Sequence, residues 1–279
     1  MRIRPLEPED VDAAREPADA TLGPPPDLDP EAARAYWTNR FERLLATDPG
    51  GCWAAEDDSG RIVGTALALV RDGIWVLAFL AVHPDAQAQG VGRRLMDAAL
   101  SHGERARGAM IASSTDPKAM RRYARAGFDL RPCVAAGGTL DRSKLPAGLR
   151  SRETGDLSLA TAIGREVRGG GYDPEDLALY VEAGWTAFRH GDDGIALAHD
   201  GRVSLLVARD EQAAIDLLWS GLATAHPGGN GDVDFISAGQ DWAIRTVLDA
   251  GLALSPDGPL FTRGELGPLR PWLPAGSIL

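Results

Sequence analysis

The chain has 279 residues and 44% hydrophobic content, which is enough to bury a substantial core and suggests two domains. Its 40 acidic residues outnumber its 29 basic residues, so the formal net charge is -11. Binding to nucleic acid needs clustered Lys and Arg, so this charge argues against a nucleic-acid partner. No stretch approaches the ~20 apolar residues that cross a bilayer, so we also expect no membrane partner.

Residues 1–7 lack the apolar core of a signal peptide. The two cysteines, Cys52 and Cys133, are too few and too isolated to predict a disulfide framework or a zinc site. Each is expected to be a small buried residue rather than a nucleophile. Together these features predict a cytoplasmic protein without a bound metal.

The first half is predicted to alternate strands and helices. A strand at Arg2–Leu6 precedes a helix over residues 8–20, and the proline-rich segment 23–26 ends that helix. A second helix is predicted to begin with Asp29 as its N-cap and Pro30 at the first helical position. Its apolar residues recur at helical spacing and should face the core: Ala33, Trp37, Phe41 and Leu44.

Three strand-like runs then predict an antiparallel meander: Cys52–Ala55, Arg61–Val70 and Ile74–Val82. After a glycine-containing loop we expect a helix over 90–102, a strand at Ala109–Ser113, a helix over 117–126 and a final strand after Phe128. This order predicts an α/β fold of the α+β type with a mixed sheet.

The pattern recurs after a linker at 141–156. The segment Asp173-Pro-Glu-Asp-Leu177 echoes Asp29-Pro-Glu-Ala-Ala33, and the chain beyond it again reads as a meander followed by helices. A repeat of this length indicates a duplicated unit. The expected tandem domains are residues 1–142 and 150–279.

The two copies differ between the meander and the next helix. The first copy has His83-Pro-Asp-Ala-Gln-Ala-Gln-Gly-Val-Gly92, whereas the second passes through Ala208-Arg-Asp-Glu-Gln-Ala-Ala-Ile215 without a glycine. A strand that runs through such a glycine loop into a helix gathers backbone N–H groups at the positive end of the helix dipole, which favours phosphate. Only the first copy is therefore predicted to bind a phosphate group.

Two other phosphate-binding loops do not fit these residues. The segment Gly90-Val-Gly-Arg-Arg-Leu95 lacks the third glycine or alanine of a dinucleotide fingerprint, and it follows a meander. It also lacks the Gly-Lys-Ser/Thr ending of a nucleoside triphosphate loop. Neither NAD nor ATP is favoured.

Two motifs resemble the GNAT (GCN5-related) family of N-acetyltransferases. Gln87-Ala-Gln-Gly-Val-Gly92 is similar to that family's coenzyme A loop, Gln/Arg-x-x-Gly-x-Gly/Ala, and follows Leu80-Ala-Val-His-Pro84, which resembles its Val-x-Pro strand end. The segment from Asp116 to Phe128 resembles the family's Asn-x-x-Ala-x-x-x-Tyr-x-x-x-Gly-Phe element, with Asp116 in place of Asn. Asp116 is also expected to be a helix N-cap before Pro117 at the first helical position. The resemblance is strong over roughly residues 1–140. As a whole, the chain resembles tandem members in which one copy has lost the coenzyme loop, so we expect two GNAT-like domains.

This resemblance implies direct transfer of an acetyl group from acetyl-CoA to an amine within a ternary complex. The strand Phe79–Val82 would polarise the thioester carbonyl, and Tyr123 stands where the family often protonates the departing thiolate, a role that a phenol can fill. The implied coenzyme-binding residues are Leu80, Ala81, Val82, Gln87, Ala88, Gln89, Gly90, Val91, Gly92, Arg93 and Asp116.

Several alternatives stay open at this stage. Glu56 and His83 are the best-placed candidates for a general base, and water is a third. The acceptor is a small-molecule or peptide amine that the sequence does not identify, because variable loops select it. A non-enzymatic acyl-CoA sensor or scaffold is the alternative function, since Asn is replaced by Asp116 and the base is unassigned. A longer acyl donor is a further alternative.

Overall fold

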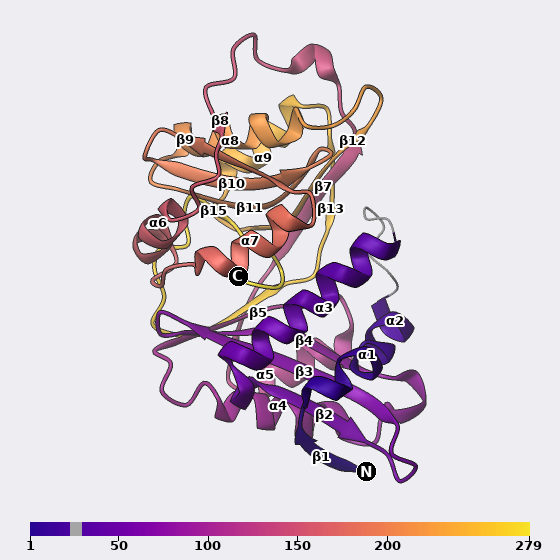
Figure 1. Cartoon of the computed structure of the whole chain (residues 1–279). Coiled ribbons are helices and arrows are strands. Elements are labelled where there is room, and N and C mark those ends of the chain that lie inside the picture. The colour runs from indigo at the N-terminus through magenta and orange to yellow at the C-terminus, as the bar shows by residue number, and fades with distance from the viewer. Residues whose placement is uncertain (23–29) are drawn as a thin grey trace. The chain divides into compact units, whose positions relative to one another are not determined.

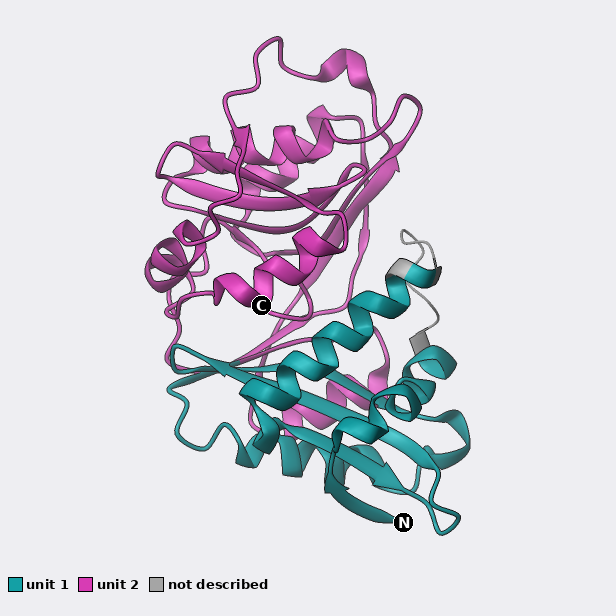
Figure 2. Cartoon of the chain, viewed as in Figure 1, with its two compact units in different colours: residues 1–109 teal, residues 110–279 magenta. Residues whose placement is uncertain are grey.

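The chain forms a mixed α/β fold, as predicted. The computed structural model describes residues 1–22 and 30–279 (Figure 1). The strands of these residues belong to two mixed sheets, and the chain divides into two compact units, Met1–Ala109 and Met110–Leu279 (Figure 2). The expected domains, 1–142 and 150–279, follow a repeat in the sequence, and a division of the chain into compact units does not test that repeat. These domain bounds therefore stay a prediction.

Unit 1 contains the predicted antiparallel meander. Its strands are β1 (Arg2–Pro5), β2 (Cys52–Glu56), β3 (Ile62–Arg71) and β4 (Ile74–Val82), and each pairs with the next in the order β1-β2-β3-β4. The fifth strand, β5 (Gly108–Ala112), begins at the end of this unit. The observed bounds lie within one or two residues of the predicted ones.

The helix predicted over residues 8–20 is instead three short elements. A 3-10 turn, η1 (Pro8–Asp10), leads into α1 (Val11–Ala14), and after Arg15 the chain continues as α2 (Glu16–Leu22). Pro17 has no N–H to donate to the carbonyl four residues earlier, so one uninterrupted helix cannot pass through it. The prediction of a single helix was wrong for this reason.

The helix α3 (Pro30–Thr47) begins at the predicted proline. The proposed N-cap Asp29 and the segment 23–26 lie outside the described residues. Of the predicted apolar face, three side chains are buried and Trp37 is half-buried, which confirms that this face meets the core: Ala33, Phe41 and Leu44.

Helices cover both faces of the unit 1 sheet. Thr65 Oγ1 on β3 donates to the carbonyl of Ala14 in α1 at 2.9 Å. A Cβ atom on the neighbouring Gly64 would lie 3.0 Å from Leu95 of α4 (Val91–Ser101). Successive strand residues point to opposite faces, so α1 and α4 lie on opposite sides of the sheet, and α3 crosses it on the side of α1 (Figure 1).

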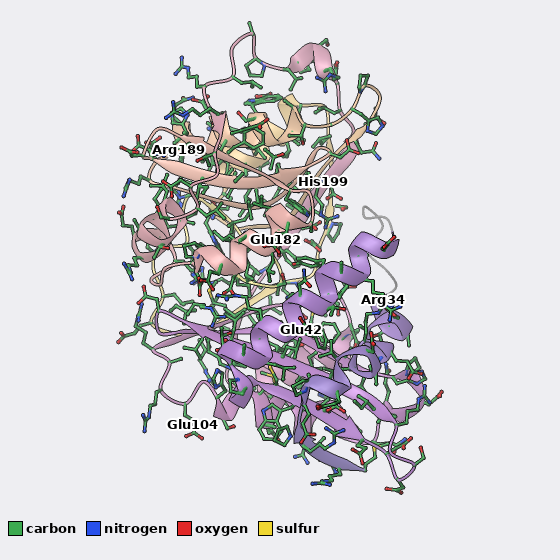
Figure 3. The ribbon with its side chains drawn as sticks, in the orientation of Figure 1. Arg34, Glu42, Glu104, Glu182, Arg189 and His199 are labelled. Carbon is green, nitrogen blue, oxygen red and sulfur yellow. The ribbon has the colours of Figure 1, made fainter. Side chains whose placement is uncertain are left out.

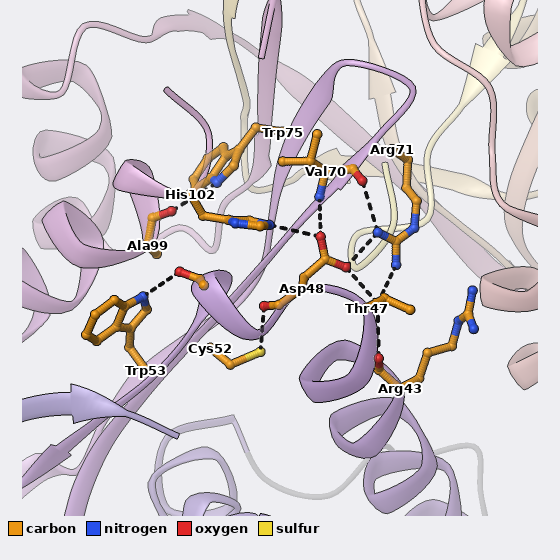
Figure 4. A network of polar contacts seen from close by, with 11 residues as sticks. Arg43, Thr47, Asp48, Cys52, Trp53, Val70, Arg71, Trp75, Ala99 and His102 are labelled. Atoms are coloured by element: carbon orange, nitrogen blue, oxygen red, sulfur yellow. Dashed lines mark hydrogen bonds and ion pairs between the residues drawn. The ribbon is translucent and has the colours of Figure 1, made fainter. Parts of the chain in front are cut away.

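A buried carboxylate ties the ends of these elements together (Figure 4). Asp48 follows α3 and is 2% exposed. Its carboxylate accepts hydrogen bonds from His102 Nε2 after α4 at 2.9 Å, from Arg71 Nη1 at 2.6 Å and from the N–H of Val70 at 2.9 Å. Burial alone would raise the pKa of Asp48, but the hydrogen bonds from His102 and Arg71 outweigh it and hold the pKa below its ordinary value.

We expect Asp48→Asn to lower the free energy of unfolding by roughly 3 kcal/mol, because it removes the charge of a buried carboxylate that accepts hydrogen bonds from Arg71 and His102. The lowered pKa also predicts that the wild-type chain keeps this contribution above about pH 4 and loses it progressively at lower pH, where the carboxylate is protonated. Urea unfolding at several pH values measures both effects. Asp58→Asn is the control, since the Asp58 side chain is 96% exposed. Equal stability of the two variants would contradict the prediction.

Unit 2 contains a second sheet in the order β8-β9-β10-β11-β12-β7-β13, with β15 also paired to β11. Figure 1 shows α8 and α9 on one side of this sheet and α6 and α7 on the other. The strands are β7 (Cys133–Thr139), β8 (Arg152–Glu153), β9 (Thr186–His190), β10 (Gly194–His199), β11 (Arg202–Ala208), β12 (Asn230–Ser237), β13 (Ala253–Pro256) and β15 (Trp272–Leu273). The helices are α5 (Pro117–Arg125), α6 (Leu159–Val167), α7 (Pro174–Glu182), α8 (Glu211–Leu222) and α9 (Asp241–Asp249).

The position of β7 was not anticipated. The strand predicted after Phe128 is interrupted, giving β6 (Asp129–Arg131) and then β7. Strand β7 lies between β12 and β13 and pairs antiparallel with both. The late strand β14 (Leu260–Gly264) instead pairs antiparallel with β6. A strand from the first half of the chain thus completes the sheet of the second half.

Among the helices of residues 1–22 and 30–279, none combines the length and the apolar composition needed to cross a bilayer.

Candidate active site

The predicted coenzyme loop connects β4 to α4 in unit 1. After Val82 the chain makes a 3-10 turn, η3 (Pro84–Ala86), and reaches the N-cap of α4 at Gly90. Gln87 Nε2 donates to the carbonyl of Val82 at 3.1 Å, and the N–H of His83 donates to Val63 at 2.8 Å. These bonds fasten the start of the loop to the sheet.

Two residues of the loop have left-handed backbone conformations. Gly90 has φ 77°, and a Cβ atom placed there would meet nothing within 4 Å, so the conformation rather than space favours glycine. Ala88 has φ 62°, which is uncommon for a residue with a side chain. Such positive φ values turn successive N–H groups toward one side of the backbone, the arrangement that forms an anion-binding nest.

The backbone N–H groups of residues 88–93 are available to a ligand. In the described part of the chain, no acceptor takes a hydrogen bond from them, and the first bond of α4 runs from the N–H of Arg94 to Gly90 at 3.2 Å. The side chain of Arg93 is exposed and has no carboxylate partner within residues 1–22 and 30–279. N–H groups at the positive end of a helix, with a cation beside them, suit a phosphate or pyrophosphate.

The strand that leads into the loop is β4. Leu80, Ala81 and Val82 pair with residues 64–66 of β3, and Ala81 and Val82 are buried whereas Leu80 is half-buried. The structure therefore holds these predicted residues in one sheet, directly before the loop.

Asp116 and Tyr123 lie on α5, in unit 2. Asp116 is the N-cap of α5 and accepts a hydrogen bond from the N–H of Lys118 at 3.0 Å, which confirms the predicted capping role. Tyr123 is 5% exposed, and its ring packs edge-on against Phe261 with the centroids 5.4 Å apart. Burial raises the pKa of Tyr123 above its ordinary value. Whether these two side chains meet the coenzyme stays a prediction.

Both candidate bases already have basic neighbours in unit 1. The carboxylate of Glu56 accepts a hydrogen bond from Arg4 Nε at 2.6 Å, and Arg4 also binds Asp10. His83 Nε2 lies 3.0 Å from Arg61 Nη2, and His83 Nδ1 accepts from the N–H of Asp85 at 3.3 Å. Neither geometry singles out one residue as the base.

One residue near β4 was not among the predicted site residues. Arg40 of α3 is 6% exposed, and its Nη2 donates to the carbonyl of Ala78 at 2.8 Å. Its sequence signal is a charged residue on an apolar helical face, three positions after Trp37 and four before Leu44.

The corresponding turn in unit 2 is closed to an anion. Between β11 and α8 the carboxylate of Asp210 caps the helix and accepts from the N–H of Ala213 at 2.9 Å. The segment beyond β14 also returns to this region, where Leu273 of β15 pairs with Leu206 of β11. A negative charge thus occupies the start of α8, whereas the corresponding N–H groups before α4 have no acceptor among the described residues, and β15 adds a further partner to β11.

The remaining candidates for chemistry are the two cysteines, as nucleophiles, and groups of side chains that could bind a metal ion. Both cysteines are unpaired and buried, as predicted, and burial raises the pKa of Cys52 to about 12 and of Cys133 to about 11. Neither thiol is therefore a ready nucleophile near neutral pH. Within residues 1–22 and 30–279, no group of three His, Cys, Asp or Glu side chains is arranged to hold a metal ion.

The comparisons with known proteins agree with this geometry. Residues 16–128 match the profile of the Acetyltransferase (GNAT) family. Residues 16–128 are therefore similar to the GNAT family of acetyltransferases. No curated protein matches the sequence.

Solved structures extend the likeness to the whole chain. A Pyrococcus horikoshii protein proposed to be an acetyltransferase aligns with a TM-score of 0.78 and 16% identity, over 100% of this chain and 95% of that one. A GCN5-related N-acetyltransferase from Sphaerobacter thermophilus aligns with a TM-score of 0.55 and 16% identity, over 99% and 98%. One from Kribbella flavida gives a TM-score of 0.59 and 16% identity, over 94% and 71%. At such identities these matches show the fold, and that fold is consistent with the predicted tandem layout.

The left-handed conformation of Gly90 leads to a stability prediction. Gly90→Ala should destabilise the chain by about 1 kcal/mol, because alanine is strained at positive φ even where space is open. Gly60→Ala is a matched control, since Gly60 has φ 87° and its Cβ would also meet nothing within 4 Å. Thermal unfolding should give similar losses for both variants, and a Gly90→Ala chain as stable as the wild type would contradict the assigned loop conformation.

Proposed function

We propose that the chain is a cytoplasmic N-acetyltransferase that transfers an acetyl group from acetyl-CoA to a primary amine of a small molecule or peptide. The observation that carries the proposal is the set of N–H groups at residues 88–93, which have no acceptor among the described residues and lie beside Arg93. The pyrophosphate of coenzyme A has the charge and the acceptor oxygens to fill this cradle. The match of residues 16–128 to the GNAT family supports the same assignment.

In this proposal each part of the site has one task. Residues 87–93 bind the pyrophosphate, and the backbone of Phe79–Val82 receives the pantetheine arm and polarises the thioester carbonyl. The amine attacks that carbonyl directly within the ternary complex, the carbon–sulfur bond breaks, and the nitrogen releases its proton to a base or to water. Asp116 caps α5 and is proposed to contact the coenzyme as well.

Tyr123 is the proposed general acid that protonates the leaving thiolate. A buried phenol with a raised pKa keeps its proton at neutral pH, as a proton donor must. Its hydroxyl is reprotonated from solvent after each turnover, so the residue is unchanged by the reaction.

We place one active site in the molecule. Asp210 already caps α8 with a negative charge, so the turn before α8 in the second copy does not offer an anion-binding site. This asymmetry supports a catalytically silent second copy.

Calorimetric titration with acetyl-CoA tests the cradle. We expect one molecule bound per chain, and we expect Gly90→Ala to weaken binding by about ten-fold because it disturbs the N–H groups. Gly60→Ala carries similar backbone strain away from the loop and should bind as the wild type does. Failure of the wild-type chain to bind acetyl-CoA would overturn the proposal, and two equivalent sites would overturn the assignment of one active copy.

Release of free thiol from acetyl-CoA, measured with a panel of amines, tests the role of Tyr123 as the general acid. Tyr123→Phe should lower kcat by roughly a hundred-fold with unchanged acetyl-CoA affinity, because the ring remains and only the proton donor is lost. The raised pKa predicts that wild-type activity does not fall through loss of this proton below about pH 10. An unchanged kcat in the variant would remove Tyr123 from the mechanism.

One observation keeps a binding protein as the second candidate. Both Glu56 and His83 are engaged by arginine side chains, so a sensor or scaffold that binds acyl-CoA without turnover has the same cradle but needs no base. Tight acetyl-CoA binding, no thiol release with any amine and no effect of Tyr123→Phe would favour this candidate. Competition between acetyl-CoA and longer acyl-CoA species for turnover identifies the preferred acyl donor.

A further inference from the structure

Arg40 is a charged residue on the buried face of α3. Its side chain is 6% exposed, Nη2 donates to the carbonyl of Ala78 at 2.8 Å, and Cζ lies 5.4 Å from the ring centroid of Trp37. Burying an arginine is costly unless its donors are used, and a long apolar residue would fill the same space without that cost. The placement of this guanidinium therefore needs a specific explanation.

The carbonyl that Arg40 contacts belongs to an extra residue in β4. Leu67 of β3 is paired with Phe79, and the next residue, Ala68, is paired with Leu77, so Ala78 has no partner in β3. An extra residue of this kind is a β-bulge, and it leaves backbone polar groups outside the ladder. Ala78 is buried, so its carbonyl needs another donor, and the guanidinium supplies a charge-assisted one.

The bulge changes which face the rest of β4 presents. Trp75 Nε1 donates to the carbonyl of Ala99 in α4 at 3.1 Å, so Trp75 points to the α4 side of the sheet. Phe79 comes four residues later and would point the same way in a regular strand. It packs instead against Trp37 of α3, with the ring centroids 5.2 Å apart. Because of the extra residue Ala78, each side chain from Phe79 to Val82 points to the face of the sheet opposite to the one it would take in a regular strand.

We infer that Arg40 is a positioning residue that holds the Ala78 bulge and thereby sets the orientation of Phe79–Val82. The catalytic consequence rests on the proposed function, which gives that segment the pantetheine arm and the thioester carbonyl. Arg40 acts through the backbone of β4, since its low exposure keeps it from the substrate. Without the guanidinium, the bulge relaxes and the backbone donors of the segment lose their fixed direction.

The aromatic rings beside Arg40 support this role. Trp37, Phe41 and Phe79 form one cluster, with centroid separations of 5.2, 5.8 and 6.4 Å. The guanidinium lies against the Trp37 face, where a cation is favourable, while its donor reaches Ala78. The cluster fixes the direction of the side chain, so the hydrogen bond is rigid.

Amide hydrogen exchange on the chain without coenzyme tests the inference directly. In Arg40→Met the amides of Phe79–Val82 should exchange roughly ten- to a hundred-fold faster than in the wild type, because one charged hydrogen bond no longer holds the bulge. Arg40→Lys keeps a cationic donor and should restore part of the protection. Equal exchange in the wild type and in Arg40→Met would overturn the inference, whatever the chain binds.

Arg34→Met is the matched control. Arg34 lies on the same helix (Figure 3), but its side chain is 60% exposed, and its ion pair among the described residues is with Asp12 on the surface. This variant should leave exchange at Phe79–Val82 unchanged. If it accelerates exchange as much as Arg40→Met does, the effect belongs to α3 in general and the inference fails.

A second measurement separates this inference from the proposed function. With acetyl-CoA labelled with carbon-13 at the thioester carbonyl, the infrared carbonyl band should shift on binding to the wild type, and Arg40→Met should reduce that shift while affinity for unacetylated coenzyme A is kept. Absence of acetyl-CoA binding to the wild type refutes the proposed function but leaves the exchange test standing. A full band shift in Arg40→Met refutes the positioning role. If Arg40→Met does not fold, Arg40→Gln, which removes the charge, is compared with Arg40→Lys, which keeps it, and faster exchange in Arg40→Gln supports the inference whereas equal exchange overturns it.

Discussion

The arrangement of β4 and its neighbouring helices in unit 1 depends on one hydrogen bond, which Arg40 donates to the carbonyl of Ala78. It satisfies the residue that interrupts the pairing of β4, and that interruption turns Phe79 toward α3 while Trp75 stays against α4. The packing of α3 and α4 on the sheet thus depends on the position of the bulge, because the side chains of β4 change faces there. The predicted coenzyme loop begins only a few residues further along, so its starting direction depends on the same bulge.

The sequence predicted the regular elements of unit 1 well because they depend on local signals. Runs of apolar residues separated by turn glycines marked β2, β3 and β4, and a proline marked the start of α3. The prediction of one helix over 8–20 was wrong because Pro17 has no N–H and interrupts the helix. The capping role of Asp116 was predicted correctly, since an N-cap is set by its immediate neighbours.

Contacts between segments that lie far apart in the chain could not be predicted from the sequence. Nothing near Asp48 indicates that His102, 54 positions later, donates to its carboxylate, because that bond depends on how α3 and α4 end against the sheet. Arg40 carried a visible signal, a charge on an apolar face, but its acceptor exists only because β4 contains a bulge. The predicted loop residues lie together in unit 1, whereas the roles of Asp116 and Tyr123 at the coenzyme stay predictions.

The insertion of β7 between β12 and β13 has a consequence for how the protein is made. Strand β7 leaves the ribosome about 90 residues before the first residue of β12, and β13 follows later still. At ordinary rates of synthesis this is a delay of roughly 5–20 seconds, during which β7 has neither of its neighbours in that sheet. The residues of β7 include two adjacent glycines, Gly137 and Gly138, and such residues lower the tendency of an unpaired strand to associate with other chains. The nascent chain therefore carries an unpaired strand that is poorly suited to aggregation, and its second sheet is completed only near the end of translation.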